Sequence, residues 1–397
     1  MEVYILDSGL YRTDVVESYE SMIWAEKYAA FGDFQLDIDP ALAEPALQGQ
    51  GTFIKIDKSQ YVGCVDSVEN KFQENGKRLL VIKGKTLEAK MRDRPNGYPT
   101  VPLVTEPIKI TTGSQVPAAA LRTLFASICG PTAAVTTDRF SPYIQATTYS
   151  PTSGRMGEPI ETPLIQTSLG DLYETIRQVC ELYRLGFRLI CPNDDGKLYF
   201  EIYTGYDRTS AQSTLPAVIF SPMLDNLTDT TELTVSETYK NVAHVYAPAY
   251  TTAPGYRVVY AGTTDASTAS FARKVLVVDA SDITDVAGTT LNNKMDQRGA
   301  EELAKCRITK VFDGQIPQTN SYVYGTDYML GDLVEKRSES GDLMQMRVTE
   351  QIFTSNSEGE KNYPTLTVDS LVTPGAWDAV SASKYWDIYT TEVWDSM

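Results

Sequence analysis

The sequence predicts a mainly β protein with α/β insertions, and three observations support this fold class. Polar and apolar residues alternate in segments such as 34–38 and 53–56, and a period of two is typical of half-buried strands. The dipeptide Asn75-Gly76 lies between two such segments and favours the positive φ angles of a tight hairpin. Helical periodicity occurs only in short stretches between the strand-rich ones.

Residues 1–110 are predicted to form the first of two antiparallel β-barrels. The chain opens with the strand-like segment 3–6, and the segments 65–72 and 79–84 flank the hairpin turn just described. Strands joined by tight turns are antiparallel, because a parallel pair needs a long crossover. We therefore expect an antiparallel sheet in this part of the chain.

Residues 111–215 are predicted to form an accessory α+β domain. Pro117 opens a short helix that ends at the following Gly-Pro pair. Ser168 and Asp171 are spaced like a capping box in front of a second helix. Two strands then flank the polar turn at 193–196.

Residues 216–372 are predicted to form the second β-barrel. A loop and a helix are inserted into it at about 250–306, and the strands that close it lie within 328–368. Residues 373–397 remain as a C-terminal arm.

The two barrel segments share a repeated pattern. The stretch that begins at Gly51 and the stretch that begins at Gly331 run through the same order of strands and polar turns. Two related β-barrels within one chain explain this repeat. Because sequence identity is slight and hairpins are common, coincidence is the alternative explanation.

The charge balance argues against a protein that grips nucleic acid. The chain has 35 Lys and Arg against 52 Asp and Glu, a net charge of −17, so it cannot neutralise many phosphates. The same charge opposes binding to anionic membranes. An acidic wall could, however, let DNA pass without adhering if the protein formed a tube.

The cysteines and the apolar runs predict a soluble product made in a cytoplasm. No Cys-x-x-Cys pair occurs, and an odd number of cysteines suits a reducing compartment. No signal peptide precedes the first strand, and no stretch approaches the roughly 18–20 apolar residues of a membrane span. The five cysteines, which we expect to be buried free thiols, are Cys64, Cys129, Cys180, Cys191 and Cys306.

The sequence predicts no enzyme, cofactor or metal site. His244 is the one histidine and lies in an apolar strand pattern, which favours a structural role over a catalytic triad or a metal site. Asp207 and Arg208 belong to a strand-end turn that we expect to be held by an ion pair or backbone contacts. A glycosidase needs only two carboxylates about 5–10 Å apart, so the geometry of the 52 acidic residues stays open.

The C-terminal arm is a candidate partner interface. Three of the four tryptophans, Trp377, Trp386 and Trp394, lie in it, and aromatic side chains are favoured interface anchors. The arm either docks on a neighbouring subunit or another protein, or packs back on its own domain. The sequence favours neither.

Several segments, in their order along nearly the whole chain, carry a family resemblance: Trp24-Ala25-Glu26-Lys27-Tyr28, Phe31-Gly32-Asp33-Phe34-Gln35-Leu36, Tyr203-Thr204-Gly205-Tyr206-Asp207-Arg208-Thr209, Phe220-Ser221, Lys240-Asn241-Val242-Ala243 and Tyr328-Met329-Leu330-Gly331-Asp332-Leu333-Val334. Together they resemble the hub, or tail-associated minor tail protein, of long non-contractile-tailed phages. This resemblance implies two similar barrels side by side, so that a homotrimer presents a pseudo-sixfold ring that continues the tail tube.

The resulting hypothesis is a structural virion protein at the tail tip, assembled in the host cytoplasm. The expected partners are the distal tail protein, the tape-measure protein and tip fibre or receptor-binding proteins, and DNA passes through the lumen without specific binding. A carbohydrate-binding host-recognition protein is the first alternative. A tail-associated cell-wall hydrolase is the second, and it ranks last because no nucleophile and base pattern is visible.

Overall fold

The structure is a computed structural model. It describes residues 1–49, 51–72, 76, 78–97, 109–110, 116–131, 133, 135–140, 144–146, 155–159, 165–166, 170–247, 255–261, 271–281, 283, 288–306, 309–315, 322–337 and 343–368. By its internal contacts the chain divides into two compact units. Unit 1 comprises Met1–Thr234 and Lys310–Asp369, and the described residues of unit 2 lie within Val235–Thr309.

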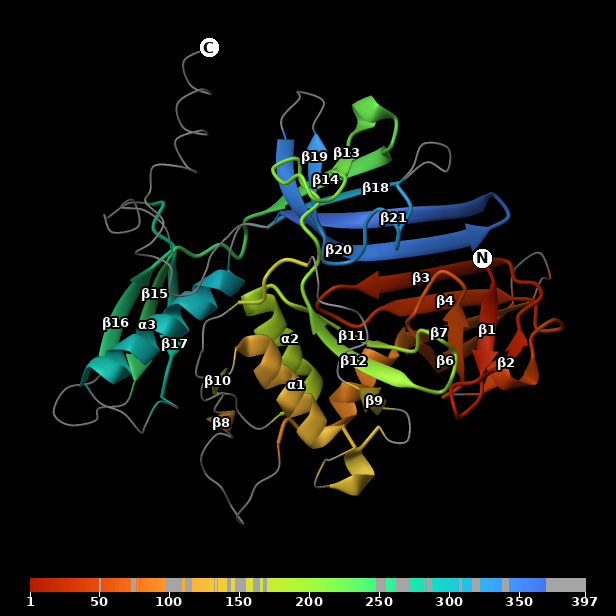
Figure 1. Ribbon diagram of the computed structural model, residues 1–397, viewed down its shortest axis with the longest axis horizontal. Coiled ribbons are helices and arrows are strands. Elements are labelled where there is room, and N and C mark those ends of the chain that lie inside the picture. The colour runs from red at the N-terminus through yellow and green to blue at the C-terminus, as the bar shows by residue number, and fades with distance from the viewer. Residues whose placement is uncertain are drawn as a thin grey trace. The chain divides into compact units, whose positions relative to one another are not determined.

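Unit 1 is built on one large sheet to which two sets of strands contribute (Figure 1). Module A, from the start of the chain, consists of β1 (Val3–Leu6), β2 (Arg12–Val15), β3 (Ser21–Lys27), β4 (Asp33–Ile38), β5 (Phe53–Ile56), β6 (Gly63–Phe72) and β7 (Arg78–Thr86). Module B consists of β13 (Ile219–Phe220), β14 (Thr228–Val235), β18 (Thr309–Gln315), β19 (Leu333–Arg337), β20 (Leu343–Asn356) and β21 (Gly359–Val368).

The two modules meet at a seam between β3 and β20. The strand order is β14-β18-β21-β20-β3-β4-β7-β6-β5-β1-β2, with β19 on β20 and β13 on β19. The first part of β20 pairs with β19, and its second part pairs antiparallel with β3, from Glu350 opposite Lys27 to Asn356 opposite Ser21. A single long strand therefore belongs to module B and also covers the edge of module A.

The sequence repeat corresponds to matching hydrogen bonds. The amide of Gly51 donates to the carbonyl of Val65 at 2.8 Å, and the amide of Gly331 donates to that of Val348 at 2.8 Å. Both glycines have a positive φ, +84° and +89°, which a residue with a Cβ adopts at a cost. In each module the pairing is also irregular directly after this valine.

Further strands extend the correspondence. Phe34 in β4 lies opposite Gly84 of β7, and Phe312 in β18 lies opposite Leu366 of β21. Both phenylalanines are buried. The order β3-β4-β7-β6-β5 in module A thus corresponds to β14-β18-β21-β20-β19 in module B, so that β14 is the counterpart of β3 and β6 is the counterpart of β20.

The predicted mainly β class is confirmed. The two modules share a sheet, and the strands that the structure describes show no closure into a separate barrel. The predicted segment boundaries at residues 110, 215 and 372 stay predictions.

An α+β layer in unit 1 lies between the modules in the chain. Its elements are the 3-10 helix η2 (Leu87–Asp93), α1 (Pro117–Ile128), α2 (Leu172–Tyr183), β9 (Ile144–Ala146), β11 (Gly186–Ile190) and β12 (Leu198–Tyr203). Pro117 opens α1 as predicted. The capping box is corrected in one respect: Asp171 is itself the N-cap of α2, and its carboxylate accepts the amide of Glu174 at 2.7 Å.

Five short elements complete the described part of unit 1. They are η1 (Pro45–Gln48), β8 (Lys109–Ile110), η3 (Thr136–Asp138), β10 (Ile165–Gln166) and η4 (Pro222–Leu224). The strands β8 and β10 pair antiparallel with each other.

Unit 2 is a three-stranded sheet with one helix. It contains β15 (Val242–Ala247), β16 (Gly255–Tyr260), β17 (Val275–Asp279) and α3 (Gly288–Lys305). β15 lies in the centre, antiparallel to β16 and parallel to β17. Alternate residues of β15, Ala243 and Val245, pack with Leu291 and Met295 of α3. In the part of the chain that the structure describes, no helix is both long and apolar enough to cross a membrane.

Candidate functional site

Two of the motifs singled out in the sequence meet around one buried carboxylate. Asp332, which precedes β19, accepts hydrogen bonds from the amides of Tyr206 at 2.7 Å and Met329 at 3.0 Å, and from Arg208 Nε at 3.1 Å. Burial raises the pKa of Asp332 to about 6, and these donors oppose the rise. The predicted ion pair in the 205–209 turn is thus present, with Asp332 as the partner of Arg208.

Backbone contacts hold the same two motifs together. The amide of Leu333 donates to the carbonyl of Tyr206 at 2.9 Å, and the amide of Arg208 donates to that of Leu333 at 2.8 Å. A Cβ on Gly205 would lie only 2.1 Å from the carbonyl carbon of Gly331. The junction is therefore a structural clamp between β19 and the chain that follows β12.

A second buried carboxylate lies at the seam. Glu26 of β3 accepts hydrogen bonds from Trp24 Nε1 at 3.2 Å, from the Tyr324 hydroxyl at 3.0 Å and from Ser59 Oγ. Burial raises the pKa of Glu26 to about 6, and the three donors oppose the rise. Because Tyr324 belongs to module B and the other two donors to module A, Glu26 ties both modules together.

The α+β layer has its own buried charges. Arg188 forms an ion pair with Glu201, with Nη2 at 2.6 Å from the carboxylate, and its guanidinium lies 4.8 Å from the centre of the Tyr203 ring. Glu88 accepts the amide of Leu189 at 2.6 Å, and burial raises the pKa of Glu88 to about 7. Each of these interior acids has a structural partner, although the second carboxylate oxygen of Glu88, Oε2, has no hydrogen-bond partner among the described residues.

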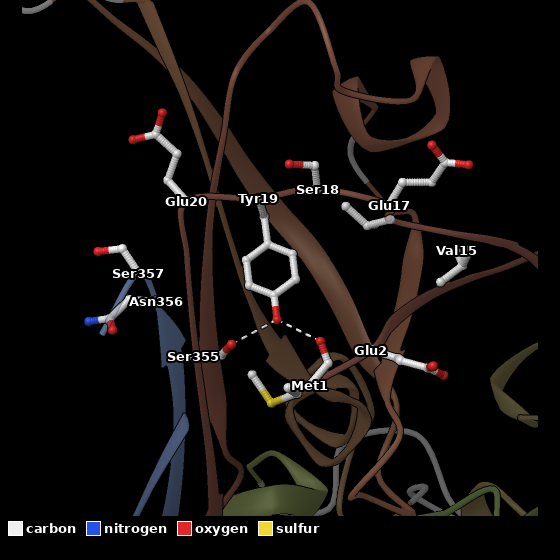
Figure 2. Close-up of a pocket in the computed structure, with 11 residues that line it drawn as sticks. Met1, Glu2, Val15, Glu17, Ser18, Tyr19, Glu20, Ser355, Asn356 and Ser357 are labelled. Atoms are coloured by element: carbon white, nitrogen blue, oxygen red, sulfur yellow. Dashed lines mark hydrogen bonds between the residues drawn. The ribbon is translucent and has the colours of Figure 1, made fainter. Parts of the chain in front are cut away.

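One open pocket lies beside the seam (Figure 2). It has a volume of about 780 Å³ and is lined by Met1, Glu2, Val15, Val16, Glu17, Ser18, Tyr19, Glu20, Ser355, Asn356 and Ser357. The Tyr19 hydroxyl lies 2.5 Å from the Met1 carbonyl oxygen and 3.0 Å from Ser355 Oγ, so it bridges the two modules. The walls offer carboxylates, hydroxyls and an amide, which suit a cationic or hydroxylated ligand.

The other predicted positions have structural partners or lie elsewhere. His244 of unit 2 is 2.9 Å from the Tyr256 hydroxyl and 3.2 Å from Arg273 Nη2. The five cysteines are free, and all but Cys306 are buried. Within the described ranges no group of three His, Cys, Asp or Glu residues could hold a metal ion. The arm residues Trp377, Trp386 and Trp394 lie outside the described residues.

Sequence reasoning missed the two carboxylates that organise unit 1. Glu26 follows Met22 and Trp24 at steps of two, so alternation places it on the buried face of its strand, where an acid is not expected. Asp332 carried a signal, since it lies in a Gly-Asp step that repeats the Gly-Thr step at Gly51. No pattern, however, linked it to Arg208.

A family model described as Siphovirus ReqiPepy6 Gp37-like protein matches residues 2–366. The chain belongs to this family. The match covers both modules, the α+β layer and unit 2, and it confirms the predicted resemblance at the level of a siphovirus tail protein family. No match was found among curated proteins.

Solved structures show the same fold at low identity. A tail protein from Neisseria meningitidis MC58 aligns with a TM-score of 0.55 and 13% identity, over 94% of this chain and 98% of that one. The 43 kDa tail protein of prophage MuSo2 from Shewanella oneidensis aligns with a TM-score of 0.53 and 12% identity, over 92% and 97%. The chain therefore has a fold found in phage tail proteins, and with the family match this supports a structural protein of a phage tail.

Proposed function

We propose that the protein is a homotrimeric hub ring at the distal end of a long non-contractile phage tail. The ring joins the tail tube to the tip proteins and encloses the channel for the tape-measure protein and DNA. It is built in the host cytoplasm and becomes part of the virion. Its neighbours are the distal tail protein and the tip fibres or receptor-binding proteins.

The observation that carries this proposal is the pair of related modules joined by the β3 and β20 seam. Three copies of a chain with two equivalent modules present six similar modules around an axis. Such a ring adapts a threefold tip to a sixfold tube, and a phage tail fold fits that position.

The net charge of −17 fits a channel that DNA passes without adhering, because an acidic wall repels phosphates and releases no counterions on contact. The work of such a ring is mechanical and electrostatic, and we propose no catalytic activity for it. The buried acids support this, since Glu26, Glu88 and Asp332 each accept hydrogen bonds inside unit 1.

Imaging the purified chain, or the tail tip that contains it, tests the proposal. We expect a threefold ring with a central channel in which each subunit contributes two similar modules. A monomer with a deep cleft lined by paired carboxylates, together with turnover of peptidoglycan, would overturn the proposal in favour of a hydrolase.

The arm at 373–397 is proposed to dock on a neighbouring subunit or tail protein through Trp377, Trp386 and Trp394. The same imaging, repeated on the chain that lacks residues 376–397, addresses this point. Weakened rings or lost partner binding support docking. Rings of unchanged size that still bind their partners contradict it.

A carbohydrate-binding host-recognition protein is a second candidate, and the pocket beside the seam is the observation that favours it. Its hydroxyls and carboxylates match the polar groups of sugars. Binding of the purified chain to host cells distinguishes this function from that of a ring that never contacts the cell surface.

A further inference from the structure

Strand β14 is an open edge of the unit 1 sheet. It lies next to β18, and no described strand lies on its other side. Its sequence contains four threonines and no proline or lysine, and Thr230, Thr231 and Leu233 are exposed. Soluble proteins usually blunt a long edge strand with charged side chains, above all lysine, with proline or with a bulge. β14 has neither proline nor lysine along its eight residues, and its charged residues are Asp229 and Glu232.

The second half of β6 is also open. β5 pairs with β6 only at Gly63 and Cys64, whereas β7 pairs with it along its length to Phe72. From Ser67 onward, the side of β6 that faces away from β7 has no partner among the described strands. Phe72 at its end is 72% exposed. Within the described part of the chain, the outer edge of this strand half in module A therefore pairs with no other strand.

These two open edges are the counterparts of the two strands that form the seam. β3 corresponds to β14, and β20 corresponds to β6, through the matched hydrogen bonds of Gly51 and Gly331. In the seam, the second half of β20 pairs with β21 on one side and with β3 on the other. The second half of β6 pairs with β7 but lacks the partner that corresponds to β3.

We propose that β14 of one copy of the chain pairs with the second half of β6 of another copy, so that the contact between copies repeats the seam within each copy. This inference rests on the proposed ring and names its subunit contact. A second copy is the occupant that the molecule itself specifies, because each copy offers one edge of each kind. The contact is heterologous, and such contacts form a ring where the rotation closes.

Chemical cross-linking tests the contact. Thr231 in β14 and Asn70 in β6 are both exposed. One variant chain has Thr231→Cys and the other has Asn70→Cys, and both also have Cys306→Ser. The remaining cysteines are buried. The two chains are co-expressed with different tags and treated with a short bismaleimide, since neighbouring strands lie about 5 Å apart. We expect several-fold more covalent dimer that joins one β14 variant to one β6 variant than covalent dimer of two identical variants.

The matched control replaces the β6 variant by Gln178→Cys, which is also an exposed position, on α2, and we expect its cross-linking to stay at background. The same samples are imaged. Cross-linking in threefold rings supports the contact. Threefold rings with background cross-linking overturn the contact and leave the ring standing. Cross-linking in open filaments supports the contact and overturns the ring. Monomers with background cross-linking overturn the contact.

Discussion

Modules A and B have the same hydrogen-bonded frame but fill it differently. In module A, Phe34 packs over Gly84, where a Cβ would lie 2.5 Å from the Phe34 ring, and it stacks on Trp24 with ring centres 5.5 Å apart. In module B, the matching Phe312 lies opposite Leu366 and has Lys336 over its ring. A core can thus be repacked around one backbone pattern when the total volume is kept.

The modules also differ in what their counterpart strands meet. β3 joins β4 through a short turn and is covered by β20. In contrast, the described residues of unit 2 lie in the chain between β14 and β18, and β14 has no described partner beyond β18. The edge of β3 is paired within the chain, whereas the matching edge of β14 is not paired with any described strand. The difference teaches that the chain of module B is interrupted by a separate compact unit at the strand whose edge stays open.

The largest expected difference between the modules is at the residue after the matched glycine. Asp332→Ala should lower the free energy of unfolding by about 3–5 kcal/mol, because it leaves Arg208 buried and unpaired. Thr52→Ala should cost only about 1 kcal/mol, since Thr52 hydrogen-bonds to exposed loop carbonyls. Urea unfolding of both variants measures the difference, and equal losses would mean that the frame alone determines stability.

A smaller difference is expected at the matched glycines themselves. Gly51→Ala should cost about 1–2 kcal/mol for the positive φ alone, because nothing lies within 4 Å of its Cβ. Gly331→Ala should cost about 3 kcal/mol or more, because a Cβ there also lies 2.3 Å from the Tyr28 ring. Thermal unfolding measures both losses of stability, and Gly157→Ala is the neutral control because nothing lies within 4 Å of a Cβ there. Equal losses for Gly51→Ala and Gly331→Ala would contradict the comparison.

The last comparison concerns pH at the seam. The folded state raises the pKa of Glu26 from 4.5 to about 6, so it binds the proton more tightly than the unfolded chain. The stability contributed by this proton is present below pH 4.5 and is lost as pH rises through 6. Glu26→Gln cannot titrate, so from pH 4 to 7 it should gain about 2 kcal/mol relative to the unchanged chain.

Unfolding titrations at several pH values measure this gain. Glu174→Gln is the control of opposite sign, because Arg177 lowers the pKa of Glu174 to about 2 and its stabilising contribution is lost as pH falls. If the difference in unfolding free energy between Glu26→Gln and the unchanged chain does not vary with pH, Glu26 is either already protonated or hydrated.

Strands, turns and helix starts were predictable from the sequence where neighbouring residues determine them. The alternation in 53–56 and the hairpin turn after Phe72 identified strands that the structure contains. Pro117 marked the start of α1, because its missing amide is not needed there. The cap of α2 is Asp171, three residues after Ser168, and the sequence could not separate the two because both residue types are good caps.

The seam and its carboxylate were not predictable in the same way. Lys27 and Glu350 are paired, but nothing in either strand specifies a partner so far along the chain. Glu26 shares a strand face with the buried Met22 and Trp24, so alternation places it inward. The strand does not reveal that Tyr324 and Ser59 supply the hydrogen-bond donors for an acid at that position. Long-range pairing depends on the whole fold, whereas strand patterns record only burial on one face.

The pairing of β3 with β20 has a consequence for synthesis. Because β3 emerges near the start of the chain and β20 near residue 350, and ribosomes add about 5–20 residues per second, the edge of β3 waits many seconds for its partner. During that interval β3 is as open as β14 is in the finished chain. An unpaired β3 edge on a nascent chain is open to pairing with the edges of neighbouring chains, so the long delay favours misassembly where copies are crowded.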